Sequence, residues 1–201
     1  SQTVVSSKLE LLRLDASEDT DLFLDGGEGL KLLELKIDGK ILSEDSYELK
    51  KQSLRIFSPS KKEFTLEIKN SLSPEKNTDL EGLYLSDGDL CTQCEAQGFR
   101  NISFFLDRPD VMAPYEVYLE AEKEQYPVLL SNGNLMESGP LEGGRHFARW
   151  QDPHAKPSYL FALVAGKLDY IQKNFKTQSG RLIDLRIYSF LAFFCIKQNC
   201  Y

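Results

Sequence analysis

Histidine is scarce in this chain of 201 residues, which contains only His146 and His154. The pair cannot form the H-E-x-x-H pattern of a zinc-binding helix, and both residues are predicted to be structural, His146 in a strand and His154 in a proline-flanked loop. The chain also lacks G-x-S-x-G, G-x-G-x-x-G and a phosphate-binding glycine loop, because residues 26–29 (GGEG) are short and polar and indicate a turn. The sequence therefore contains no complete catalytic set.

Cysteine is also rare, with only Cys91, Cys94, Cys195 and Cys200. Four cysteines are too few for a disulfide scaffold in a domain of this size, which predicts a reducing compartment such as the cytosol or an organelle stroma. Cys91-x-x-Cys94 has the spacing of half a zinc site or of a thiol–disulfide motif. Because the C-terminal pair is a poor second half and no βαβ pattern surrounds the motif, we predict that these cysteines pack and that the chain holds no metal.

Long apolar runs and basic clusters are missing as well. The longest apolar run, Phe190–Ile196, is far shorter than the roughly 20 residues that a membrane span needs. The chain has 31 acidic and 24 basic residues, a formal charge of −7, and no basic stripe that could follow phosphates. We therefore expect a soluble protein with neither a membrane nor a nucleic acid as its partner.

Short segments in which apolar and polar residues alternate are abundant. In residues 64–69, Phe64, Leu66 and Ile68 fall on one face and polar residues on the other. Asp38-Gly39 and Asn132-Gly133 have the composition of two-residue hairpin turns. Such segments recur about every ten residues with few helical periods, which predicts a mostly β fold, an antiparallel sandwich or curved sheet. The expected strands are Val4–Leu14, Leu30–Ile37, Ser53–Phe57, Phe64–Lys69, Gly82–Leu85, Tyr115–Ala121, Tyr126–Leu130, Asn134–Met136, His146–Trp150, Leu160–Val164 and Leu182–Tyr188.

The pattern changes near the C-terminus. The last 13 residues, SFLAFFCIKQNCY, have no alternation and an uninterrupted apolar core. This change predicts a β-rich domain over residues 1–188 and a divergent apolar tail over residues 189–201. Because its apolar run carries no charge, we expect the tail to be poorly packed or to cover an exposed edge.

The stretch Asp89–Val111 is irregular and rich in chemically active side chains, which makes it the first place to look for a site. Strand alternation would place Gln93 and Glu95 on one side of the backbone and Cys94 on the other. A carboxylate beside an amide suits the binding of a cationic ligand end, because the carboxylate accepts charge-assisted hydrogen bonds. An exposed strand face without a function has the same spacing.

Residues 92–100 (TQCEAQGFR) and 104–111 (FFLDRPDV) closely resemble the N-terminal domain of bacterial- and plant-type aminopeptidase N, a zinc metallopeptidase family of the gluzincin group. Residues 77–84, 126–134 and 159–166 agree with the same family, and the resemblance runs from about Leu9 to Tyr188. It implies a saddle-shaped, β-rich domain that lies against a thermolysin-like catalytic domain. The first strand of the family would precede Ser1.

The resemblance also implies roles for the two candidate residues. Glu95 would hold the free α-amino group of a peptide, and Gln93 would line the pocket for its first side chain. The family's zinc helix, its G-x-M-E-N loop and its transition-state tyrosine would all follow Ser189, so zinc is expected in the full-length parent. This chain would then be a substrate-recognition domain for peptide N-termini that is inactive alone.

Two other hypotheses remain. A non-catalytic β domain could bind peptides or proteins, or self-associate, through the surface that the catalytic domain would otherwise cover. A thiol-based site at Cys91 and Cys94 is the third.

Overall fold

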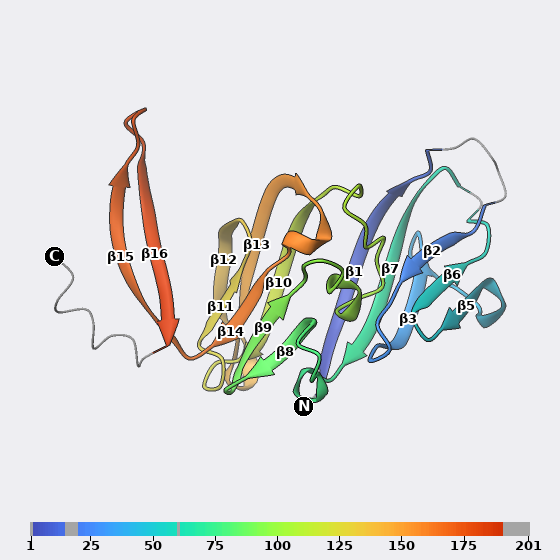
Figure 1. The fold of residues 1–201 in the computed structure, drawn as a ribbon, viewed down its shortest axis with the longest axis horizontal. Helices are drawn as coiled ribbons and strands as arrows, with labels where there is room; N and C mark the ends of the chain where they lie inside the picture. Colours follow the sequence, from blue (N-terminus) through green and yellow to red (C-terminus); the bar gives the residue numbers. More distant parts are fainter. Residues whose placement is uncertain (1, 15–19, 60, 191–201) are drawn as a thin grey trace.

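The computed structural model of the chain describes residues 2–14, 20–59 and 61–190 and confirms a mostly β fold (Figure 1). None of the helical segments in these ranges is long and apolar enough to cross a membrane. The strands are β1 (Thr3–Leu12), β2 (Leu22–Asp25), β3 (Lys31–Ile37), β4 (Lys40–Ile41), β5 (Tyr47–Lys50), β6 (Ser53–Ile56), β7 (Glu63–Leu72), β8 (Gly82–Ser86), β9 (Asp89–Gln93), β10 (Ala113–Glu122), β11 (Val128–Ser131), β12 (Asn134–Pro140), β13 (Arg145–Lys156), β14 (Leu163–Gly166), β15 (Leu168–Lys176) and β16 (Leu182–Phe190). Short 3₁₀ turns are η1 (Glu44–Ser46), η2 (Pro74–Lys76), η3 (Phe99–Asn101), η4 (Glu142–Gly144) and η5 (Ser158–Leu160).

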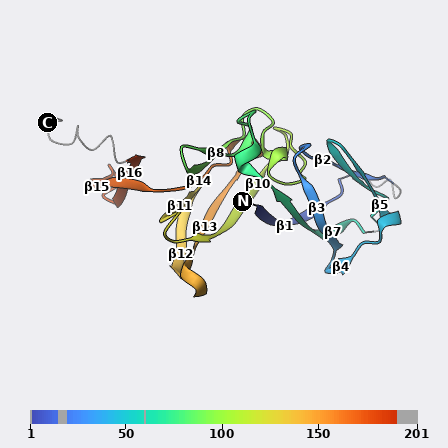
Figure 2. The same ribbon diagram turned by 90° about the horizontal axis from the view of Figure 1, so that it is seen from below.

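The strands form antiparallel sheets in the orders β1-β7-β3-β4, β2-β6-β5, β10-β13-β12, β11-β14-β9-β8 and β15-β16. Seen from below, β12, β13, β10, β1, β7 and β3 follow one another across the molecule and make its curved, saddle-shaped body (Figure 2). The sheets β2-β6-β5 and β11-β14-β9-β8 lie against this body. An isolated bridge between Asp25, at the end of β2, and Phe105 connects the sheet of β2 to the irregular stretch 89–111.

The N-terminal core forms on the face of β7 that the alternation predicts. Phe64, Leu66 and Ile68 are all at most 9% exposed, while the residues between them are only partly buried. Full burial of a side chain of this size stabilises the fold by about 1.5–3 kcal/mol. The same core contains Leu24, Leu35, Leu54, Ile56 and Phe104.

A second core is largely aromatic and lies beneath the stretch 89–111. Phe99 packs edge-on against Phe105 and Phe161, with ring centroids 4.9 and 5.2 Å apart, and Tyr115 lies beside all three rings. Edge-on pairs of this kind are favourable beyond the area that they bury. This core also contains Cys94, and it fixes the backbone on which the candidate residues are carried.

The hairpin predicted at Asn132-Gly133 is wrong, because β11 pairs with β14 whereas β12 pairs with β13. The Asn132 side chain donates to the carbonyl of Leu160 (3.1 Å) and accepts from the amide of Ala162 (2.6 Å). Gly133 has a positive φ of 87°, and a Cβ there would lie 2.2 Å from the Gln151 carbonyl oxygen. The Asn132 side chain therefore fixes the turn at which the chain passes from the sheet of β11 to the sheet of β12.

Other boundaries also differ from the prediction. Asp38-Gly39 does connect two paired strands, β3 and β4. The strands β2, β5, β9 and β15 were not predicted, and β13 continues through Pro153, where a break was expected. The register jumps from the pair Tyr115–Asp152 to the pair Ala113–Lys156, so the proline falls in a bulge, where it removes no ladder hydrogen bond.

The hairpin β15–β16 extends from one end of the body, beyond the other sheets (Figure 1). Its last two residues, Ser189 and Phe190, belong to the predicted tail 189–201, and the rest of that tail lies outside the described residues. The predicted domain boundary at residue 188 stays a prediction.

Candidate functional site

Gln93 and Glu95 lie where β9 ends and the chain turns toward η3. Gln93 pairs with Gly82 of β8, and two residues earlier Cys91 pairs with Val164 of β14, so the strand is held on both edges. Gln93 and Glu95 are both exposed, whereas Cys94 between them is only 3% exposed. The burial thus follows the alternation that the sequence predicts.

The turn after β9 is tight and hydrogen-bonded. The amide of Gly98 donates to the Cys94 carbonyl (2.8 Å), and the Gln93 side-chain amide donates to the Glu95 carbonyl (3.1 Å). A Cβ on Gly98 would lie 2.3 Å from the Gln93 carbonyl oxygen, so only glycine fits this close approach. The peptide bond between Glu95 and Ala96 is cis. Because the Gln93 side chain is hydrogen-bonded to the backbone of Glu95, the two candidate residues are held next to each other.

The Glu95 carboxylate has no ion-pair partner among the residues that the structure describes. Two carboxylates near this turn are, by contrast, already paired, because Asp25 and Asp107 both contact Arg100. An exposed carboxylate without an internal cation can accept hydrogen bonds from an ammonium or guanidinium group of a ligand.

The two cysteines do not have the properties of a reactive thiol pair. Both are free, with Cys91 half-buried and Cys94 buried. Burial, and then the nearby Asp107 carboxylate, raises the pKa of the Cys94 thiol to about 12. Burial and Asp89 likewise raise the pKa of Cys91. A reactive cysteine needs a lowered pKa, so the geometry favours packing, as the sequence indicates.

The two histidines make local structural hydrogen bonds, one through its ring and the other through its backbone. His146 is 8% exposed, and its Nε2 donates to the Tyr126 carbonyl (2.7 Å). The backbone amide of His154, an exposed residue, donates to Asp152 (3.1 Å). Within ranges 2–14, 20–59 and 61–190, no group of three or more His, Cys, Asp or Glu side chains could hold a metal ion. The side chains in these ranges therefore do not fit a zinc ion.

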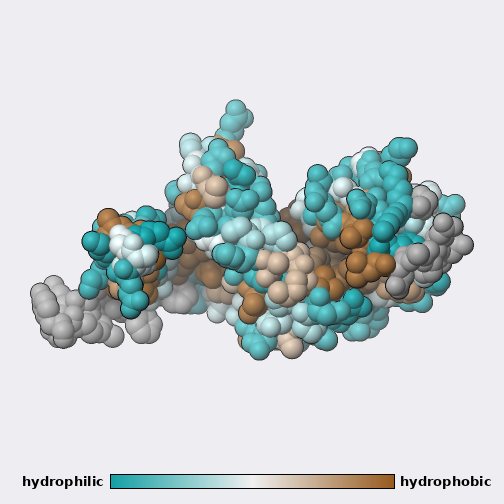
Figure 3. All heavy atoms as spheres, turned by 90° about the horizontal axis from the view of Figure 1, so that it is seen from above, coloured by the Kyte–Doolittle hydropathy of each residue, from teal (hydrophilic) through white to brown (hydrophobic). Residues whose placement is uncertain are grey.

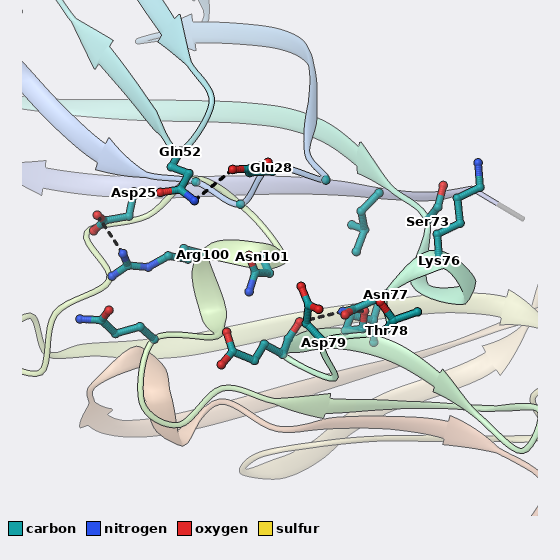
Figure 4. A pocket seen from close by; sticks show the side chains of 17 residues that line it. Asp25, Glu28, Gln52, Ser73, Lys76, Asn77, Thr78, Asp79, Arg100 and Asn101 are labelled. Atoms are coloured by element: carbon teal, nitrogen blue, oxygen red, sulfur yellow. Dashed lines mark hydrogen bonds and ion pairs between the residues drawn. The ribbon is translucent and has the colours of Figure 1, made fainter.

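A polar cleft of about 1020 Å³ lies beside η3, between the turn 26–29 and the loop 73–81 (Figure 4). Gln97 lines it, but Gln93 and Glu95 do not. Several of its polar groups are already bonded to one another: Asp25 pairs with Arg100 (3.3 Å), and Gln52 donates to Glu28 (3.3 Å). The cleft therefore reaches the candidate turn at Gln97 and does not extend to Gln93 or Glu95.

These observations define a mostly antiparallel β domain whose most distinctive exposed feature is an amide–carboxylate turn. Residues 12–160 match the model of the Peptidase M1 N-terminal domain, and the chain belongs to this family.

Curated relatives include aminopeptidase N of Haemophilus influenzae and of Escherichia coli K12, each 47% identical over 186 and 187 residues. These matches cover 92% and 93% of this chain, but the chain spans only about a fifth (21%) of either relative's length.

Solved structures agree with the assignment. Aminopeptidase A of Legionella pneumophila, solved in complex with aspartic acid, is 39% identical with a TM-score of 0.86, over 92% of this chain and 22% of that chain. An M1 zinc metallopeptidase from Deinococcus radiodurans has a TM-score of 0.73 at 15% identity, over 92% of this chain and 42% of that chain, which shows the shared fold alone.

Proposed function

We propose that this chain is the substrate-recognition domain of a zinc aminopeptidase that removes N-terminal residues from peptides. In this proposal the Glu95 carboxylate binds the α-ammonium group of the peptide, and Gln93 lines the pocket for the first side chain. The observation that carries it is the exposed Glu95 carboxylate, which has no internal cation among the described residues and sits on a turn fixed by the Gln93 amide (3.1 Å). Each charge-assisted hydrogen bond to the ammonium would contribute about 1.5–3 kcal/mol.

Binding the ammonium group has a direct consequence for the reaction. It places the first peptide bond at a fixed distance from Glu95, and such positioning is a large part of enzymatic rate enhancement. Zinc, expected in the full-length parent, would supply an activated water and polarise the scissile carbonyl. Since the described residues offer no ligand set for zinc, we expect no hydrolysis by this chain alone. The free cysteines Cys91 and Cys94 support a reducing compartment, the cytosol or an organelle stroma.

Glu95→Gln tests the proposal, because it removes the charge and keeps the shape. A free-amine dipeptide amide should bind the wild-type chain weakly, and the substitution should lower the affinity by about tenfold, the equivalent of one charge-assisted hydrogen bond. Glu124→Gln, at an exposed carboxylate elsewhere, is the matched control and should leave the affinity unchanged. Equal binding by the E95Q and E124Q chains would refute the role of Glu95. Turnover of an aminoacyl substrate that is abolished by a chelator would refute the predicted inactivity.

A second candidate function, docking of a protein domain, is favoured by the hairpin β15–β16. One of its faces carries Ile171, Phe175, Leu185 and Ile187, which are 45–64% exposed. In Figure 3 the hairpin lies at the left of the view and shows some hydrophobic atoms among polar ones. A two-stranded hairpin is marginally stable by itself, so a covering partner would stabilise it.

We infer that the partner is the catalytic portion of the parent aminopeptidase. The hairpin follows the family match, which ends at residue 160, and the relatives are about five times as long as this chain. Ile187→Glu should weaken association with a separately produced catalytic portion, whereas Gln172→Glu on the opposite face should not. Dimerisation of the isolated chain that I187E abolishes, without binding of the catalytic portion, would instead assign the face to a second copy.

A further inference from the structure

A buried carboxylate lies beneath the turn that carries Glu95. The Asp107 side chain is only 1% exposed, and the polar groups around it all come from other segments of the chain. Its Oδ2 accepts from the Arg100 backbone amide (3.1 Å) and from Arg100 Nε (3.0 Å), and its Oδ1 accepts from the Ser158 hydroxyl. Asp107 therefore joins η3 to η5 from the inside of the fold.

Arg100 makes further contacts, which attach η3 to Asp25 and to the turn 26–29. Its Nη2 donates to the Asp107 carbonyl (3.0 Å), and its Nη1 pairs with Asp25 (3.3 Å). The backbone carbonyl of Arg100 accepts from the Gly27 amide (2.8 Å), which attaches η3 to the turn 26–29. A guanidinium group with this many fixed partners is a rigid attachment point.

The turn 94–100 is thus held at its two ends while its tip is exposed. At the first end, Cys94 is buried in the aromatic core directly after the paired strand β9. At the second end, Arg100 is bonded to Asp107 through both its backbone and its side chain. Glu95, Ala96 and Gln97 between these ends are all exposed, so the direction of the Glu95 carboxylate depends on the two attachments.

We propose that Asp107 is a positioning residue for Glu95: through Arg100 it fixes the turn that aims the Glu95 carboxylate at the peptide ammonium group. This inference rests on the proposed function for its purpose and on the contacts of Asp107 for its physical basis. Asp107 is buried and does not contact the substrate itself. It acts by keeping the exposed carboxylate in one orientation, so that little conformational entropy is lost on binding.

The perturbation is Asp107→Asn, which keeps the size of the side chain but places a donor against the Arg100 donors. Asp110→Asn is the matched control, because Asp110 belongs to the same segment and forms an exposed ion pair with Arg108 (3.2 Å). The first readout is amide hydrogen exchange at Gly98, whose amide bonds to the Cys94 carbonyl within the turn (2.8 Å). We expect exchange there to accelerate about tenfold or more in D107N, relative to amides of β13, and not in D110N.

The second readout is a double-mutant cycle on the affinity for a free-amine dipeptide amide. D107N should lower the affinity about tenfold in the Glu95 background and have no further effect in the E95Q background. A purely structural role would give equal effects in both backgrounds. Unchanged exchange at Gly98, or such equal effects, would overturn the positioning role.

Two further outcomes are also decisive. If the wild-type chain binds no peptide, the proposed function fails, and the exchange at Gly98 still decides whether Asp107 fixes the turn. If D107N does not fold, Arg100→Lys replaces it, since lysine keeps the charge and loses the forked contact. R100K should then accelerate exchange in the turn 94–100 while the amides of β13 stay protected, and an unaltered turn in R100K would overturn the proposal.

Discussion

Gly98→Ala is predicted to destabilise the domain through a steric conflict in the candidate turn. The added Cβ would lie 2.3 Å from the Gln93 carbonyl oxygen and 3.0 Å from the Cys94 Cα, both of them backbone atoms that cannot rotate away. The turn would have to open, which also breaks the hydrogen bond from the Gly98 amide to the Cys94 carbonyl (2.8 Å).

The expected loss of stability follows from three terms. Overpacking costs about 1–3 kcal/mol, the lost hydrogen bond about 1 kcal/mol, and the lower entropy of the unfolded alanine chain offsets about 0.4–1 kcal/mol. The net destabilisation is about 1–3.5 kcal/mol, which lowers the melting temperature of a domain of this size by about 2–14 °C.

Urea unfolding followed by circular dichroism measures this difference directly. Gly29→Ala is the control, because no atom lies within 4 Å of its Cβ position and its backbone is not left-handed. G29A should change the free energy of unfolding by no more than about 0.5 kcal/mol. If G98A were as stable as G29A, the close approach of the backbone at Gly98 would not be a constraint on the turn.

Three further predictions concern other parts of the molecule. The hydrogen bonds from Lys156 and from the His154 amide lower the pKa of Asp152, so its contribution to stability is present above the ordinary carboxyl pKa of 3.8 and is lost as the pH falls through the lowered value. Asp152→Asn should be less stable than wild type at pH 7, and the two unfolding curves should converge in strong acid; a constant difference would contradict this assignment. Because the pKa of Cys94 is about 12, iodoacetamide at pH 8 should modify it only after unfolding, and rapid labelling of native Cys94 found by peptide mapping would contradict its burial. Ile187→Glu should reduce any self-association seen in sedimentation velocity, and an unchanged sedimentation coefficient in a self-associating sample would exclude the β15–β16 face from that contact.

Much of the fold could be predicted from alternation because one face of most strands is buried. The segment with Phe64, Leu66 and Ile68 shows this clearly, since its apolar side chains form the N-terminal core. The strands β2 and β5 were missed because four residues are too few to establish a period of two. The hairpin at Asn132-Gly133 was predicted wrongly because local turn chemistry does not specify which strands pair, and here the Asn132 side chain bonds to a distant segment.

The candidate site could likewise be predicted from the sequence only in part. Alternation correctly placed Gln93 and Glu95 at the surface and Cys94 in the core, because burial in a strand end follows a local rule. The attachment of Arg100 to Asp107 could not be predicted, since it depends on how an irregular segment folds back on itself. Asp107 belongs to a stretch that the sequence marks as rich in chemically active side chains, but only the structure shows that Asp107 is buried.

The role of Glu95 is tested most directly by backbone amide shifts of the ¹⁵N-labelled chain during titration with a free-amine dipeptide amide and with its N-acetylated form. We expect saturable shifts confined to residues 93–98 with the free amine, and none there with the acetylated peptide, which carries no ammonium group for Glu95 to bind. Identical shifts with both peptides, or shifts that avoid this turn, would contradict this role.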